Sequence, residues 1–324
     1  MATATADAAT AAARPPRGEG SPIAVQVRGV LAKELRGRMR GPRAFIVLSV
    51  YMLLLSGFTL LIYGLVKLAA TSTPTIPAGK IVFLGLVAFQ LGLVCFLAPS
   101  FTAGVISGER ERQTYDLLMT TPLPLPLVVG AKLLAALAYV LLLIVAALPL
   151  MSIAVFLGGV APVEAGIALV LLLASALVCG TVGLCFSAWV RSTIGAAALA
   201  YGTMMLPVFA LPIVFGIVAS FAGAIVSSAG SSAGLVWVYY IAGFIYCLNP
   251  FIAGGATEFI IAADKSVLFF STSVPTGTGS VTVYVPGPWL IYTVMALLVA
   301  AVFFALALYF ARPTRQVGRK RAGR

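Results

Sequence analysis

A dense group of charged residues lies between two long apolar segments of this chain, in residues 107–123. Its charges have both signs, and it holds five of the chain's 30 charged residues: Glu109, Arg110, Glu111, Arg112 and Asp116. Such side chains form ion pairs and charge-assisted hydrogen bonds, through which a protein fixes the register and choice of a partner. The stretch is therefore the candidate contact with a soluble partner. A solvated loop that only holds the flanking segments is the alternative.

Helix signals in the same stretch predict a helix of about three turns. Ser107 belongs to the residue types that cap helix N-termini, and the acidic residues that follow lie where the helix dipole favours negative charge. The proline-rich sequence after the stretch ends this helix by about Thr120. Tyr115, Leu118 and Met119 recur at helical spacing and predict one apolar face.

The composition predicts a membrane protein. Of the 324 residues, 61% are hydrophobic and 9% are charged, against about 25% charged in soluble domains, and the mean hydropathy is +1.09. The net charge of +12 is concentrated at the two ends, with eight Lys/Arg in residues 14–43 and six in residues 312–324. This placement is typical of a topology signal, so we expect no nucleic-acid partner.

The residue types argue against an enzyme and against a bound cofactor or metal. The chain has no histidine, which removes the commonest general base and metal ligand. No Gly-rich loop followed by Lys-Ser/Thr is present, so nucleotide is not bound in that way. No CxxC pair occurs among the four cysteines, which we expect to pack as small apolar residues: Cys95, Cys179, Cys185 and Cys247.

These features predict an all-α polytopic membrane protein with a six-span domain over residues 44–311. Six apolar intervals are long enough to cross a bilayer: residues 45–66, 81–106, 130–157, 166–190, 193–219 and 289–311. Pro207 and Pro212 lie in the fifth interval and should kink it. With a cytoplasmic N-terminus, 18 Lys/Arg fall inside and only Lys67, Lys80 and Lys265 outside. This asymmetry places both termini in the cytoplasm.

Residues 220–287 form the predicted external region. The run Leu235–Leu248 is short for a crossing and rich in Trp and Tyr, so we expect a re-entrant or interfacial helix. A seventh span there is the alternative, but it would place the basic C-terminus outside. The β-branched segments Val267–Val274 and Val281–Val285 flank a Gly-rich turn and predict a small hairpin. Glu164 is expected at a further external loop.

The two ends of the chain are expected to lie on the cytoplasmic side. Residues 1–22 have a disordered composition, and residues 312–324 form a basic tail. Residues 23–43 predict an amphipathic helix on the inner leaflet, in which Lys33, Arg36 and Arg40 face the headgroups. A basic segment that only fixes topology is the alternative.

The charged loop resembles the loop between spans two and three of type-2 ATP-binding-cassette (ABC) permeases. That loop reads roughly Gly-Glu-Arg-Glu-(Arg/Lys)-Gly-Thr-(Leu/Tyr)-Glu-x-Leu-Leu-x-Thr-Pro-(Leu/Val). Gln113 stands where the family usually has Gly, and Asp116 where it has Glu. Both changes are mild on the surface of a helix. The matching residues are Gly108, Glu109, Arg110, Glu111, Arg112, Thr114, Tyr115, Leu117, Leu118, Thr121, Pro122 and Leu123.

The resemblance implies a permease subunit of an exporter in the cell membrane. Two permease chains, identical or homologous, would pair above two cytoplasmic ATPase subunits, and ATP and Mg²⁺ would bind in the ATPase. The loop would act as a coupling helix. Its implied ATPase-coupling residues are Glu109, Arg110, Glu111, Arg112, Thr114, Tyr115, Asp116, Leu117 and Leu118.

A secondary transporter without an ATPase partner is the alternative function. Such a transporter usually carries buried ionisable groups near the middle of the membrane. The apolar intervals show almost no carboxylates, and this absence favours a chain driven by an ATPase. The residues do not specify the cargo.

Overall fold

The computed structural model of the chain describes residues 42–69, 77–115, 124–228, 232–264, 267–276 and 279–312. The predicted N-terminal tail, the interfacial helix with Lys33, Arg36 and Arg40, and the basic tail from residue 313 lie outside these ranges. The elements are α3 (Pro42–Ala69), α4 (Ala78–Thr102), α5 (Ser107–Glu111), α7 (Leu125–Ala146), α8 (Leu148–Phe156), α9 (Pro162–Trp189), α10 (Thr193–Met205), the π-helix η2 (Leu206–Ala210), α11 (Leu211–Ser228), α12 (Ser232–Tyr246), α13 (Pro250–Asp264), β1 (Phe269–Thr276), β2 (Gly279–Pro286) and α14 (Pro288–Ala311).

Proline marks the start of most of these helices. α3, α9, α13 and α14 each begin with a proline, and α7 and α8 have one at their second position. Proline suits the first turn of a helix because its missing N–H would have no partner there and its φ angle is already helical. The apolar runs therefore form separate helices joined by short connections.

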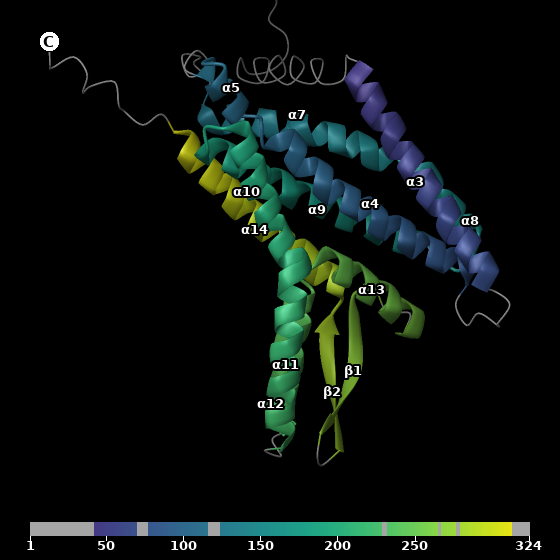
Figure 1. The fold of residues 1–324 in the computed structure, drawn as a ribbon. Helices are drawn as coiled ribbons and strands as arrows, with labels where there is room; N and C mark the ends of the chain where they lie inside the picture. Colours follow the sequence, from purple (N-terminus) through teal and green to yellow (C-terminus); the bar gives the residue numbers. More distant parts are fainter. Residues whose placement is uncertain are drawn as a thin grey trace, which may run out of the picture.

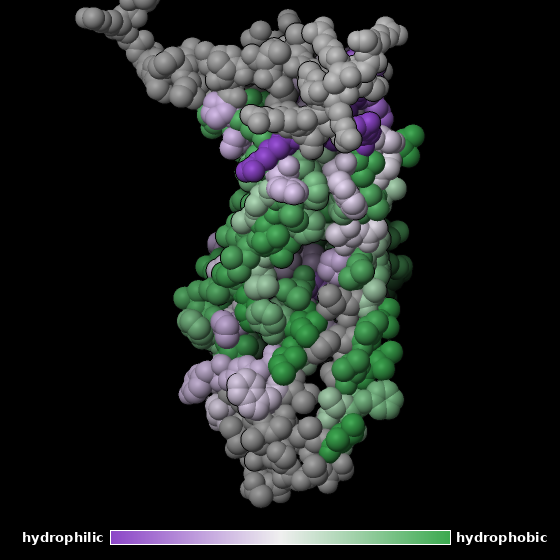
Figure 2. Space-filling model, turned by 90° about the vertical axis from the view of Figure 1, so that its left-hand side faces the viewer, coloured by the Kyte–Doolittle hydropathy of each residue, from purple (hydrophilic) through white to green (hydrophobic). Residues whose placement is uncertain are grey.

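The fold class is confirmed: six helical segments among the described residues are long and apolar enough to cross a membrane. They overlie the six predicted intervals: Ala44–Leu68, Ala78–Glu111, Leu125–Phe156, Pro162–Trp189, Thr193–Ala222 and Pro288–Ala311. Apolar residues cover most of the visible surface between the two ends of the bundle, and hydrophilic residues gather near one end (Figure 2). We call that end, where α5 lies, the loop end, and the opposite one the hairpin end (Figure 1).

The helix α9 is the centre of the bundle. In the most apolar 18-residue stretch of this helix, 72% of the residues are buried. The corresponding values are 11% for the first span, in α3, and 7% for the fifth span, Thr193–Ala222. Small residues let its neighbours approach closely. A Cβ at Gly183 of α9 would lie 2.1 Å from Thr102 Oγ1 of α4. The helix α14 packs along α9 through one buried stripe: Tyr292, Ala296, Ala300, Ala307 and Ala311.

The fifth span is interrupted at Pro207, as the sequence predicts. The chain forms a π-helix over Leu206–Ala210 between α10 and α11. Proline removes a backbone donor, and the carbonyls of the preceding turn lose their helical partners. α10, η2 and α11 have 13, 5 and 18 residues, together roughly 50 Å long at about 1.5 Å per residue. This length exceeds the ~30 Å thickness of the apolar core of a bilayer.

Asn249 ties this interruption to the helices that follow it. The side chain is 3% exposed, and its Nδ2 donates to the Pro207 and Val208 carbonyls at 3.3 and 2.8 Å. Its Oδ1 accepts from the backbone N–H of Phe251 at 2.9 Å and of Ile252 at 3.3 Å, which caps α13. One side-chain amide thus binds two backbone carbonyls in the π-helix and two backbone N–H groups at the start of α13.

The region predicted to be external forms a projecting group of elements at the hairpin end (Figure 1). α12 packs along α11 and contacts β1, and the chain then bends by 117° between Tyr240–Tyr246 and Pro250–Ala263. The predicted hairpin is confirmed, since β1 and β2 pair antiparallel from Phe269↔Pro286 to Thr276↔Gly279. The helix predicted over Leu235–Leu248 is α12, and its entry into one leaflet stays a prediction.

We expect Asn249→Ser and Asn249→Ala to separate the two roles of this amide. Serine can cap α13 but is too short to reach Pro207 and Val208, so it should lower stability by about 1–2 kcal/mol. Alanine also removes the cap and should lower stability by about 1 kcal/mol more. Thermal unfolding of the purified chain in lipid nanodiscs measures both losses. Wild-type stability of the serine variant would contradict the role assigned to the two carbonyl contacts.

Candidate functional site

The charged loop begins with a short helix, and the prediction of one three-turn helix is wrong. α5 ends at Glu111, and the chain turns over Arg112–Thr114. Gln113 has φ of 58°, a left-handed conformation that glycine adopts without steric strain and other L-residues adopt at a cost of about 1–2 kcal/mol. The turn therefore explains why glycine suits this position, and why glutamine there is not a mild change on a helix surface.

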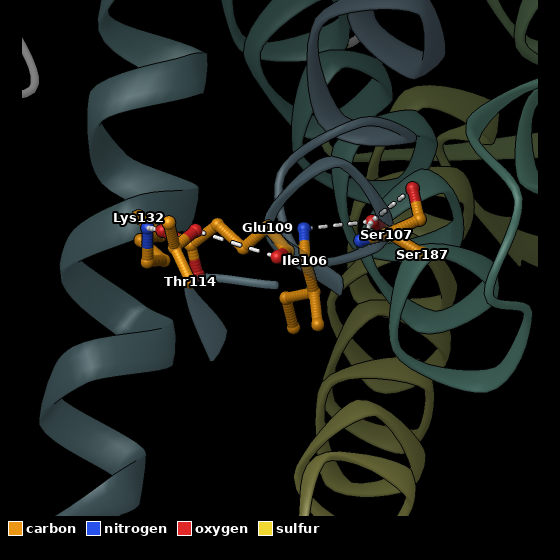
Figure 3. A network of polar contacts seen from close by, with 6 residues as sticks. All are labelled: Ile106, Ser107, Glu109, Thr114, Lys132 and Ser187. Carbon is orange, nitrogen blue, oxygen red and sulfur yellow. Dashed lines mark hydrogen bonds and ion pairs between the residues drawn. The ribbon is translucent and has the colours of Figure 1, made fainter. Parts of the chain in front are cut away.

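The start of α5 is held by α9. Ser187 Oγ accepts from the backbone N–H of Ile106 and of Ser107, at 2.9 and 3.0 Å (Figure 3). Ser107 Oγ instead donates back to the Ala103 carbonyl at 2.8 Å, so the prediction that Ser107 caps the helix is wrong. All of Ser107 and Ser187 is buried. The first turn of the loop is thus fixed to the last turns of the central helix.

Glu109 and Lys132 form a buried ion pair between the loop and α7. Lys132 Nζ lies 2.5 Å from Glu109 Oε1, and the two side chains are 5% and 25% exposed (Figure 3). The Thr114 hydroxyl donates to the Glu109 backbone carbonyl at 3.3 Å and closes the turn behind it. A charge buried this far needs its partner, because removing one member of such a pair destabilises a protein by about 3–5 kcal/mol.

Arg110 joins the loop to the ends of two spans. Its guanidinium donates to the Ala188 carbonyl at 2.6 Å and to the Phe310 carbonyl at 3.2 Å. These carbonyls lie in the last turns of α9 and α14, where the helix leaves carbonyls unpaired and a cation is favoured. The guanidinium also lies 4.9 Å from the ring centroid of Tyr115, and the hydroxyl of Tyr115 donates to the Ala311 carbonyl.

Glu111 connects the loop to the start of α10. Its Oε1 accepts from the backbone N–H of Thr193 at 2.8 Å and from the Thr193 hydroxyl at 3.1 Å. A carboxylate at a helix N-terminus binds free backbone donors and the positive end of the dipole. Ser192 caps the same helix through Gly195 N–H at 3.2 Å. α10 thus begins against the charged loop.

The predicted coupling residues therefore divide into two groups. Glu109, Arg110 and Tyr115 are partly buried and contact α7, α9 and α14. Glu111, Arg112 and Thr114 are exposed, as is Gln113 between them, which is not one of the predicted residues. The remaining ones, Asp116, Leu117 and Leu118, lie outside the described residues. The structure adds three residues that we did not single out as site residues: Lys132, Ser187 and Thr193.

A second buried ionic cluster lies at the hairpin end. Lys80 Nζ is 3.2 Å from Glu164 Oε1 and 3.3 Å from Glu258 Oε2. The expectation that Glu164 lies at a loop is wrong, because it is in the first turn of α9 and is 5% exposed. Buried ionisable groups are therefore present in the bundle. Lys80 and Glu164 lie in the first turns of α4 and α9, at the ends of the spans.

Comparison with known protein families identifies the chain. The family model described as ABC-2 family transporter protein matches residues 29–313, which include all six spans and both ionic clusters. A comparison with curated proteins found no match.

We expect Glu109→Gln to lower stability more than Glu111→Gln, the same change two residues away. The first leaves the Lys132 charge buried without its partner, at a cost of about 3–5 kcal/mol, whereas the second affects an exposed cap and should cost less than about 1 kcal/mol. The double variant Glu109→Gln/Lys132→Met should recover much of the loss, because it removes both charges. Thermal unfolding in nanodiscs measures all three. Equal losses in the two single variants would exclude a structural role for the pair.

Proposed function

We propose, since this chain belongs to the ABC-2 family of transporter proteins, that it is the permease subunit of an ATP-driven exporter. The loop of residues 107–123 would contact a separate cytoplasmic ATPase and couple ATP hydrolysis to movement of the spans. The observation that carries this proposal is the direct bonding of one charged loop to four other helices, α7, α9, α10 and α14. A loop that only connected two spans would not need these contacts.

The bonds of the loop provide a way to transmit motion. The buried pair of Glu109 and Lys132 holds α7, and Arg110 holds α9 and α14. Glu111 holds the start of α10. If the ATPase displaces the loop on nucleotide binding, these bonds would carry the displacement to helices that lie far apart in the sequence. Coupling of this kind needs two conformations of the bundle that nucleotide favours differently.

The exposed residues are the proposed contact with the ATPase. Arg112, Gln113 and Thr114 face outward, beside the region that continues into Asp116, Leu117 and Leu118. The inward-facing Glu109, Arg110 and Tyr115 would transmit motion rather than touch the partner. This division refines the sequence-based expectation that the whole stretch lies against the ATPase.

The assembly proposed from the family has two such chains and two ATPase subunits. ATP and Mg²⁺ would bind only in the ATPase, and the loop end would face the cytoplasm in the cell membrane. One observation favours the alternative of a secondary transporter: the buried ionisable cluster of Lys80, Glu164 and Glu258. Two of its three residues, Lys80 and Glu164, lie in the first turns of α4 and α9, at the ends of these spans, whereas ion-coupling groups usually lie near the middle of the membrane.

We expect Arg112→Glu to weaken association with the ATPase while the permease remains folded. Arg112 is exposed, and exposed charges contribute little to the stability of their own protein but fix register and partner choice. Arg191→Glu is the matched control, because it makes the same charge change at the exposed loop end, outside the loop. Co-purification of the ATPase with the tagged permease, and transport into inverted vesicles, report the effect.

A loss of association of roughly tenfold is expected for Arg112→Glu, with a smaller loss for Arg191→Glu. If Arg112→Glu retains both its ATPase and its transport rate, the exposed face of this loop is not the coupling surface.

The proposed orientation is tested at Gln316, in the basic C-terminal tail. With six spans and both ends inside, a cysteine at this position in a cysteine-free chain should react with a membrane-impermeant maleimide only after the cells are opened. A cysteine at Gly57, in α3, is the control that should react in neither case, because apolar surroundings suppress thiolate formation. Labelling of the Gln316→Cys chain in intact cells would refute the six-span orientation.

A further inference from the structure

A sizeable apolar chamber lies between four helices at the hairpin end. Its volume is about 630 Å³, within the range of about 300–1,000 Å³ that small-molecule sites occupy. α3, α4, α9 and α13 supply its wall through apolar side chains, among them Ile62, Leu84, Leu171 and Phe251. Gly255 of α13 also lines it and is exposed, so the chamber opens to the surface at this side. Its volume and apolar lining suit a hydrocarbon chain.

One end of this chamber carries a charge. Among the described residues of the lining, Glu258 is the only charged one, and it belongs to the buried cluster with Lys80 and Glu164. The side chains of Glu164 and Glu258 are 6% and 8% exposed. Two carboxylates share one ammonium, so the cluster has a formal charge of −1. Such an excess charge in an apolar bundle is costly without a partner.

The hydrogen bonds of the cluster are also incomplete on the carboxylate side. Glu258 Oε2 lies 3.3 Å from Lys80 Nζ but accepts no hydrogen bond from the described residues, and neither does Glu164 Oε2. The nearby polar residue Thr257 is already used, because its hydroxyl donates to the Ala253 carbonyl and accepts from Trp289 N–H. A cationic donor entering through the chamber would complete the cluster, and so would a proton held between the two carboxyl groups.

We propose that this chamber binds an amphiphile with a protonated amine head, with the ammonium against Glu258 and the hydrocarbon tail between α3, α4, α9 and α13. The ammonium supplies the missing positive charge and hydrogen-bond donors, and the tail fills a space that water would occupy poorly. A metal ion fits less well, because no group of three or more His, Cys, Asp or Glu residues suited to a metal lies among the described residues. A neutral amphiphile would leave the cluster at −1.

The proposed function is needed only to assign a role to this amphiphile. In an exporter it would be a cargo molecule, or a membrane lipid with a primary ammonium head; both have the same binding chemistry. The binding itself requires neither ATPase nor transport. Binding can therefore fail while coupling through the loop is intact, and the reverse also holds.

The experiment compares dodecylammonium with dodecanol, two probes that share a tail and differ in the charge of the head. Equilibrium dialysis uses the purified wild-type chain in phosphatidylcholine nanodiscs, and empty nanodiscs give the lipid background. We expect specific binding of dodecylammonium to be tenfold or more tighter than that of dodecanol. A proton held between the two carboxyl groups would instead neutralise the cluster, and equal specific affinities for the two probes would overturn the proposal.

Two variants should change the preference for dodecylammonium over dodecanol in opposite directions. Glu258→Gln removes the carboxylate that faces the chamber and should reduce the preference to about onefold. Lys80→Met removes the competing ammonium and should raise it several-fold. A merely structural cluster would lose stability in both variants without a change in the preference, and an unchanged preference in folded Glu258→Gln would refute the site. The wild-type comparison decides the question if either variant does not fold.

A third variant tests the tail. An added Cβ at Gly255 would meet no heavy atom within 4 Å, so Gly255→Leu can be accommodated and should narrow the chamber. This variant should weaken the binding of both probes several-fold and keep the ratio of their affinities; unchanged binding of both would place the tail elsewhere.

Repeating the wild-type measurement in phosphatidylethanolamine nanodiscs distinguishes a membrane lipid from a free cargo molecule as the source of the ammonium head. If phosphatidylethanolamine competes with dodecylammonium, the occupant is a membrane lipid. If it does not compete, the occupant is a free amphiphile.

Discussion

A buried charge in an apolar bundle must have a partner, and this requirement organises both ends of the molecule. Water cannot reach Lys132 or Lys80 freely, since both residues are less than a tenth exposed. Each is therefore satisfied by a carboxylate from another element, Glu109 for the first and Glu164 with Glu258 for the second. Because removing one member of such a pair leaves an uncompensated charge, the helices that carry the two members must stay together.

The sequence predicted the spans well because hydrophobic length and proline positions are local signals. An apolar run with a proline at its first or second helical position marks each of α3, α7, α9 and α14, and the β-branched segments around a Gly-rich turn mark the hairpin. The predicted starts of α4, α7 and α9 were late by three to five residues. For α4 and α9 the reason is that Lys80 and Glu164, which lie just before the predicted starts, look like loop residues in a hydropathy plot. Both are in the first turn of a helix, where their charges pair with each other inside the bundle.

The site was less predictable because its geometry depends on one backbone angle. With a continuous helix over residues 107–120, Glu109 and Arg110 would lie among solvated charges. The left-handed turn at Gln113 ends that helix early, so Tyr115 returns toward α14 while Arg112 faces outward. A glycine at position 113 would have indicated this turn. The partners Lys132, Ser187 and Thr193 are 23 or more residues away in sequence from the loop residues that they bind, and no local pattern connects them to the loop.

The charged loop at the loop end and the buried cluster at the hairpin end both involve the same two helices, α4 and α9. α4 begins beside Lys80 and leads into the loop, and α9 begins beside Glu164 and ends at the carbonyl that Arg110 binds. The pair is in close contact where Gly183 meets Thr102, with no room for a larger residue without a shift of backbone or side chain. Two helices so closely packed move as one body more readily than they slide. A displacement of the loop would therefore reach the wall of the chamber beside Glu258 through α4 and α9, which makes this helix pair the physical connection between the proposed ATPase contact and the proposed amphiphile site.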